Sequence, residues 1–74
     1  MNLIKALIQK RVDEIARSLI DEGYRLMVNV SLPGSHFMKL RHKENRKLIS
    51  IIGNYQTRKI TLRSGAKILK EEDI

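Results

Sequence analysis

The chain has 74 residues, a formal net charge of +7, 42% apolar residues but only 4% aromatic residues, and no cysteine. A chain this short forms at most one small domain, because it buries only about 60% of the surface that its unfolded form exposes. The lack of cysteine excludes disulfides and thiolate metal sites, and no apolar run reaches the roughly 18 residues of a membrane span. We therefore expect one cytoplasmic domain over residues 1–74, with an aliphatic core and no contact with membranes.

Residues 2–22 are predicted to form an amphipathic helix. Their apolar side chains recur at intervals of three and four residues, which is the helical period. These side chains are Leu3, Ile4, Leu7, Ile8, Val12, Ile15, Leu19 and Ile20. Asn2 is a candidate N-cap, and Gly23 follows where a left-handed residue commonly ends a helix. A single helix cannot cover its own apolar stripe, so the segments that follow must cover it.

The next two segments alternate with the period of two that is typical of strands. In residues 24–32, the side chains expected on the buried side are Tyr24, Leu26, Val28, Val30 and Leu32. Residues 33–35 supply a turn. Residues 36–42 return as a second strand, with Met38 and Leu40 on the buried side. Residues 43–46 are predicted to be the hairpin loop that follows.

Three further segments are expected to extend the sheet. Residues 47–52 form a more continuously apolar strand, which Gly53 and Asn54 are expected to end. Residues 58–63 alternate again, with Ile60 and Leu62 on the buried side. Residues 66–69 are either a short last strand or the start of a helix, and residues 71–74 form an acidic tail.

The simplest packing that buries both apolar sets is an α+β fold, in which the N-terminal helix lies on an antiparallel meander of three to five short strands. A small barrel of the SH3 or Sm type, preceded by the same helix, is the alternative. In that case Gly34, Gly53 and Gly65 would stand at the bends of the strands.

Positive charge is segregated along the chain. Residues 1–24 hold four basic and four acidic residues, whereas residues 25–70 hold eleven basic residues and one acidic residue, Glu44. A surface that serves solubility alone usually mixes both signs, so this segregation favours a polyanionic partner. Alternation places most of the cations on the side of the sheet away from the helix, with the others in the loop over 43–47.

We therefore predict a nucleic-acid-binding module that contacts the phosphates of RNA or DNA without reading sequence and without catalysis. The candidate residues are Arg25, Phe37, Lys39, Arg41, Lys43, Arg46, Lys47, Lys59 and Arg63. Phe37 is the one aromatic side chain expected beside these cations, where it would stack on a base. Two histidines six residues apart, without carboxylates, do not form a metal site, and no cofactor motif is present.

A second interpretation is enzymatic. A helix that ends at Gly23 and Tyr24, a strand, the tripeptide Gly34-Ser35-His36 and a basic strand follow one another in this sequence. This order resembles the layout of HicA-type mRNA-interferase toxins over residues 15–52. The resemblance implies that His36 acts on RNA as a general base, a role that suits an imidazole near neutral pH.

A third interpretation is a protein-binding regulator. The helical stripe is longer than a small sheet can cover, and Leu3, Ile4 and Leu7 are the residues expected to stay exposed. Exposed apolar patches mark interfaces, here for a homodimer or for a larger protein partner. The basic surface could instead bind an acidic protein. Size and composition are similar to those of accessory regulators of phages or mobile elements.

Overall fold

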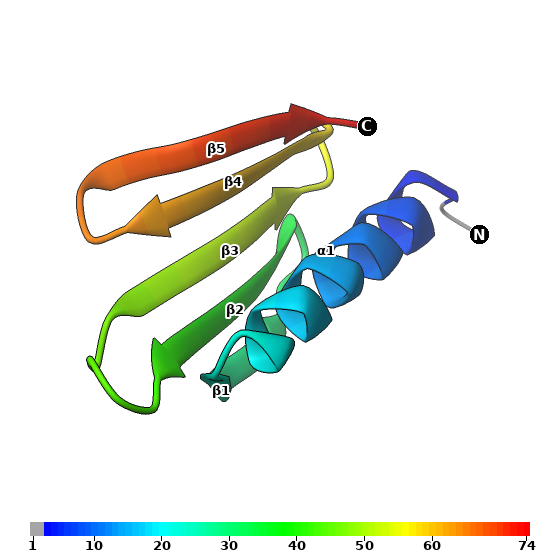
Figure 1. The fold of residues 1–74 in the computed structure, drawn as a ribbon. Coiled ribbons are helices and arrows are strands. Elements are labelled where there is room, and N and C mark those ends of the chain that lie inside the picture. Colours follow the sequence, from blue (N-terminus) through cyan, green and yellow to red (C-terminus); the bar gives the residue numbers. More distant parts are fainter. Residues whose placement is uncertain (1–2) are drawn as a thin grey trace.

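The computed structural model describes residues 3–74, which form one helix followed by five strands (Figure 1). The elements are α1 (Leu3–Asp21), β1 (Tyr24–Ser31), β2 (Ser35–His42), β3 (Leu48–Asn54), β4 (Lys59–Ser64) and β5 (Lys67–Asp73). The strands form one antiparallel sheet in the order β1-β2-β3-β4-β5. The predicted α+β meander is therefore confirmed. The barrel alternative is wrong, because β1 and β5 remain the two open edges of the sheet.

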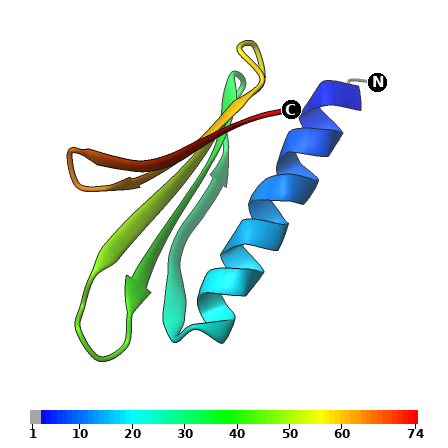
Figure 2. The same ribbon diagram turned by 45° about the horizontal axis from the view of Figure 1, so that its top comes forward.

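Helix α1 covers one side of the sheet and packs mainly on β1, β2 and β3 (Figures 1 and 2). The core lies between these layers and consists of Ile8, Val12, Ala16, Leu19, Met38, Leu40, Ile49, Ile51 and Ile60. Gly23 ends the helix with a φ of 104°, and its N–H donates to the carbonyl of Ile20, so the predicted helix end is confirmed. The candidate N-cap Asn2 lies outside the described residues. No helix within residues 3–74 is long and apolar enough to cross a membrane.

A β-bulge in β1 changes the predicted alternation. Leu26 pairs with Leu40 and faces α1, but the next pair joins Val28 to Lys39, so Met27 is the extra residue. Side chains of directly paired residues lie on the same side of a sheet. Val28 and Val30 therefore lie on the side away from α1, and the prediction that they are buried under the helix is wrong.

Two predicted strand ends are also wrong. Gly53 lies inside β3, where a β-carbon would stand only 2.5 Å from Cγ2 of Ile8, so glycine here allows close approach of α1 and does not end the strand. Residues 71–73 of the predicted acidic tail belong to β5 and pair with β4 through Glu71, Glu72 and Asp73. The last strand is thus longer than the predicted one over 66–69.

Candidate nucleic-acid interface

The side of the sheet that faces away from α1 is called the outer face below. Strand pairing places side chains on it in rows that cross the sheet. One row contains Arg25, Arg41 and Leu48, and the next contains Val28, Lys39, Ser50, Arg63 and Ile68. The third contains Val30, Phe37, Ile52, Thr61 and Glu71. Cations thus lie near the end of the sheet that carries the β2–β3 turn, and the third row is largely apolar.

Five predicted binding residues, three from outer-face positions of β1 and β2 and two from the β2–β3 turn, meet at this end of the sheet. They form what is called the basic patch: Arg25, Lys39, Arg41, Lys43 and Arg46. Arg25 and Arg41 are direct cross-strand partners, so their side chains start about 5 Å apart. None of the five forms an ion pair with a carboxylate of residues 3–74. Like charges this close repel one another, and an anion bound between them would relieve that repulsion.

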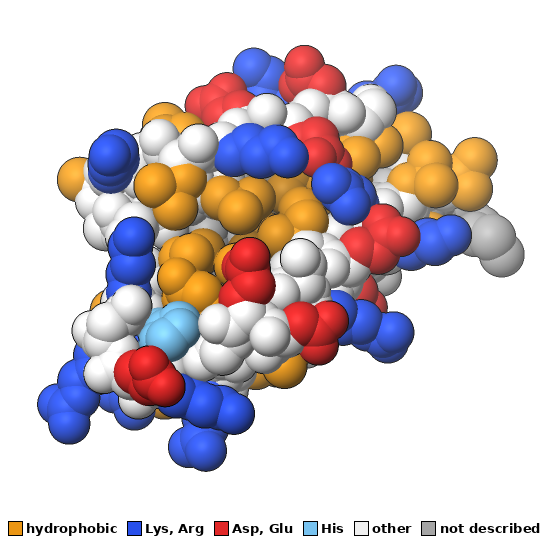
Figure 3. Space-filling model, viewed as in Figure 1, with side chains coloured by type: hydrophobic (Ala, Val, Ile, Leu, Met, Phe, Trp, Pro, Cys, Tyr) orange, Lys and Arg blue, Asp and Glu red, His pale blue; other side chains and the backbone are white. Residues whose placement is uncertain are grey.

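Figure 3 shows the helix-bearing side of the molecule, where Lys and Arg side chains gather around the end formed by the β2–β3 turn. Over the rest of this side, basic and acidic side chains are mixed and surround a central group of hydrophobic side chains. Lys47 belongs to the same turn, and its N–H donates to Oδ1 of Asn45 at 2.8 Å, but its side chain lines neither of the two depressions described below.

The β2–β3 turn has a fixed shape because it is hydrogen-bonded to the end of α1. The N–H of Lys43 donates to the carbonyl of Gly23 at 3.0 Å, and the N–H of Arg46 donates to that of His42 at 3.2 Å. Arg46 has a φ of 60°, a conformation that costs a side chain other than glycine roughly 1–2 kcal/mol. Arg58 has the same φ in the β3–β4 turn. The left-handed conformation is therefore a feature of this type of turn and is not specific to Arg46.

His42 links the turn to the helix and stands at the edge of the basic patch. Its Nδ1 accepts from the backbone N–H groups of Glu44 and Asn45 at 3.2 and 3.4 Å. Nδ1 is therefore unprotonated, so Nε2 carries the proton and donates to the carbonyl of Glu22 at 3.2 Å. The ring also makes an edge-on contact with Tyr24, at 4.9 Å between centroids. The sequence predicted only a polar residue beside the turn.

Lys59 is separated from the basic patch. It pairs with Asp73 across the β4–β5 ladder, and its Nζ lies 4.0 Å from the Glu71 carboxylate. The carboxylates of β5 thus stand among the cations that were predicted to continue across this part of the outer face. Arg63 lies closer to the patch, since Ser50 alone separates it from Lys39 in their row. Its side chain is half-buried, and its Nε has no hydrogen-bond partner among residues 3–74.

Phe37 lies on the outer face, beside the cations, but aliphatic side chains flank it. It pairs with Val30 on β1 and Ile52 on β3 and is half-buried between them. The ring is therefore part of an apolar row that adjoins the basic patch at Lys39. One ring in this position offers a limited stacking surface for a base.

His36, the candidate general base, lies on the opposite side of the sheet. It is 9% exposed, its strand partners are Ser31 and Gly53, and the β-carbon position of Gly53 touches α1. Both ring nitrogens are buried without a hydrogen-bond partner among residues 3–74. A general base needs contact with its substrate and a partner that orients it. Here the ring lies under the helix layer, away from the basic patch.

The apolar start of α1, predicted as a partner interface, is partly exposed. Leu3 and Leu7 are 67% and 42% exposed, whereas Ile4 packs against the core. Two exposed leucines are common on protein surfaces and do not by themselves define a partner.

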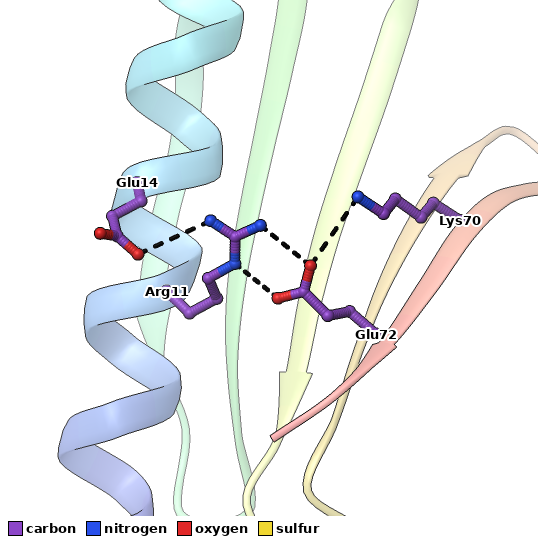
Figure 4. Close-up of polar contacts among 4 residues, drawn as sticks. All are labelled: Arg11, Glu14, Lys70 and Glu72. Atoms are coloured by element: carbon purple, nitrogen blue, oxygen red, sulfur yellow. Dashed lines mark hydrogen bonds and ion pairs between the residues drawn. The ribbon is translucent and has the colours of Figure 1, made fainter.

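An ion pair joins α1 to the far edge of the sheet (Figure 4). Nη2 of Arg11 donates to Oε1 of Glu72 at 2.9 Å, and Nε donates to Oε2. Glu14 and Lys70 flank the pair at 3.6 and 3.8 Å. The hydrogen bonds from Arg11 lower the pKa of Glu72, against the opposing effect of its burial. This pair is structural, because it lies on the helix-bearing side of β5.

No family model, curated protein or solved structure matches this chain. Residues 3–74 also contain no group of three or more His, Cys, Asp or Glu side chains arranged to hold a metal ion. The geometry of the basic patch is therefore the basis of the functional proposal.

Proposed function

We propose that the protein binds nucleic acid without catalysis, through contacts between the basic patch and phosphates. The observation that carries the proposal is the convergence of five cations from β1, β2 and the β2–β3 turn, none of which is neutralised by an ion pair within residues 3–74. Each cation that contacts a phosphate releases condensed counterions. Five such contacts support binding that is independent of sequence and sensitive to salt.

Charge reversal tests this proposal directly. The variant Lys39→Glu, Arg41→Glu, Arg46→Glu is expected to lose binding to a short mixed-sequence oligonucleotide at low salt, because three positions that attract phosphate would repel it. Fluorescence anisotropy measures the affinity. For the unmodified protein, log Kd against log salt concentration should have a slope of about 3.5 for a single strand, as expected for five contacts.

A matched control separates the patch from net charge. Lys10, Arg17 and Lys67 are exposed and lie outside the patch. Reversing these three to Glu lowers the formal net charge from +7 to +1, as the patch variant does, since each reversal subtracts two charges. The control variant should retain most of the affinity. Equal loss in both variants, or unchanged affinity in the patch variant, would contradict the proposal.

A further inference from the structure

Two depressions adjoin one another within the basic patch. The first has a volume of about 390 Å³ and is lined by Arg25, Arg41, His42, Lys43 and Arg46. The second has a volume of about 450 Å³ and is lined by Met27, Val28, Lys39, Arg41, Arg46 and Leu48. Arg41 and Arg46 line both, so a single ligand can contact the two depressions at once.

The first depression suits a group of high negative charge. Four cations line it together with His42, and no carboxylate does. Both ring nitrogens of His42 already form hydrogen bonds with the backbone, so the four cations, and not His42, contact the anionic group. A phosphodiester carries one negative charge, whereas a terminal phosphate carries about two near neutral pH and three acceptor oxygens. A terminal phosphate therefore matches four converging cations better than an internal phosphate does.

The second depression suits an unpaired base. Met27, Val28 and Leu48 give it aliphatic walls and are 46%, 36% and 40% exposed. The bulge at Met27 creates this wall, since uninterrupted alternation would turn Val28 toward α1. A flat base face can rest on such side chains while Lys39, Arg41 and Arg46 hold the backbone. In a duplex the terminal base is paired and stacked on its neighbour, so separating it to lie against these walls costs unpairing and unstacking free energy.

The geometry points to one site for the terminal nucleotide of a single strand that ends in a phosphate. The phosphate occupies the first depression, the base rests in the second, and Arg41 and Arg46 lie between them. In the row Arg25, Arg41 and Leu48, neighbouring strands are about 4.8 Å apart, so the row spans about 10 Å, the scale of one nucleotide. This inference rests on the proposed function and specifies the ligand of the same patch.

Single strands that differ only in their end groups test this terminal site. Affinities are measured for one short single strand in three forms, with a 5′-phosphate, with a 3′-phosphate and with hydroxyl groups at both ends. One phosphorylated form should bind about tenfold more tightly than the hydroxyl form. Arg25→Gln and Lys43→Gln should each remove most of that difference. Failure of all three forms to bind at low salt would refute the proposed function itself, whereas equal binding of all three would refute only the terminal site.

The base contact is tested with a matched pair of variants on β1. Val28→Thr replaces a methyl group in the second depression by a hydroxyl group, and Val30→Thr makes the same change on the outer face outside both depressions. The first change should weaken binding of the phosphorylated strand but not of the same strand with an abasic terminal nucleotide. The second should affect neither ligand. Equal effects of the two variants would overturn the base contact.

Competition identifies the source of the phosphate. Inorganic phosphate should compete with the phosphorylated strand far less well than the matching mononucleotide, because it lacks the base. If inorganic phosphate competes equally well, the site binds free phosphate and the inference is wrong. A blunt duplex with the same terminal phosphate should bind more weakly than the single strand. Equal binding of that duplex would also refute the assignment.

Discussion

His36 and His42 lie on the same strand and point to the same side of the sheet, yet their ring nitrogens have opposite surroundings. His42 makes three hydrogen bonds with the backbone, whereas His36 has no partner for either nitrogen among residues 3–74. A buried polar group without a partner lowers stability by about 1–3 kcal/mol. The sequence cannot distinguish the two residues, because their surroundings depend on which residues the strands and the helix bring next to them.

The two histidines should therefore respond to the same substitution in opposite directions. His36→Leu removes two unpaired polar atoms at similar volume and should raise the free energy of unfolding by about 1 kcal/mol, or the Tm by about 4–8 °C. His42→Leu removes the link between the β2–β3 turn and α1 and should lower the free energy of unfolding by about 1–2 kcal/mol. Urea unfolding at neutral pH measures both changes. A destabilised His36→Leu variant would show that the buried ring has a stabilising partner.

At the scale of elements, the contact of α1 with β3 depends on the absence of a side chain at Gly53. A β-carbon there would lie 2.5 Å from Cγ2 of Ile8 and 3.0 Å from Cγ2 of Val12. Gly53→Ala should therefore force the helix away from the sheet and lower the free energy of unfolding by about 1–3 kcal/mol. Gly34→Ala is the control, because a β-carbon there meets nothing within 4 Å, and its effect should stay within about 0.5 kcal/mol. Equal effects in thermal unfolding would contradict the close-packing role of Gly53.

Periodicity predicted the helix, the strand order and most of the buried residues, because these follow from the spacing of apolar residues within each segment. It failed at β1, where Met27 is a bulge in an otherwise uninterrupted alternation. A bulge is fixed by the neighbouring strand, and YRLMVNVSL contains no glycine or proline before the turn that would mark one. The apolar wall of Met27, Val28 and Leu48 beside the cations was missed for this reason. The charge pattern did indicate the cations of the patch, since Lys39 and Arg41 are consecutive outward positions of β2, Lys43 and Arg46 lie in the turn that follows, and Arg25 is an outward position of β1.

At the scale of the whole molecule, the two signs of charge have different positions. The basic patch lies on the outer face at the end with the β2–β3 turn, while the carboxylates of β5 lie at the opposite end of the sheet beside Lys59 and Arg11. Asp21 is the last residue of α1 and Glu22 follows it, so both lie on the side of the sheet that bears α1. A polyanion that approaches the outer face at the patch therefore meets few negative charges, and Glu44 is the one acidic residue of the turn.

The Arg11–Glu72 pair connects the first element of the chain to the last and should make stability depend on pH. The pKa of Glu72 is lower in the folded protein than its unfolded value of about 4.3, because Arg11 donates hydrogen bonds to the carboxylate. The stabilisation is therefore present above that unfolded pKa and is lost as the pH falls through the folded pKa. The pair is partly exposed, with side-chain exposures of 37% for Arg11 and 22% for Glu72, so about 0.5–1 kcal/mol is expected.

Substitution of Glu72 tests this dependence. Glu72→Gln should lower the free energy of unfolding by about 0.5–1 kcal/mol at neutral pH. In acid well below the pKa of the carboxyl group, the variant and the unmodified protein should have the same free energy of unfolding. Glu71→Gln is the control, since the neighbouring side chain lies on the outer face and makes only an exposed 4.0 Å pair with Lys59. Urea unfolding across the acid range measures both variants. A deficit in Glu72→Gln that persists in acid would mean that the side chain stabilises β5 by packing, because protonation would already have removed the ionic contribution from the unmodified protein.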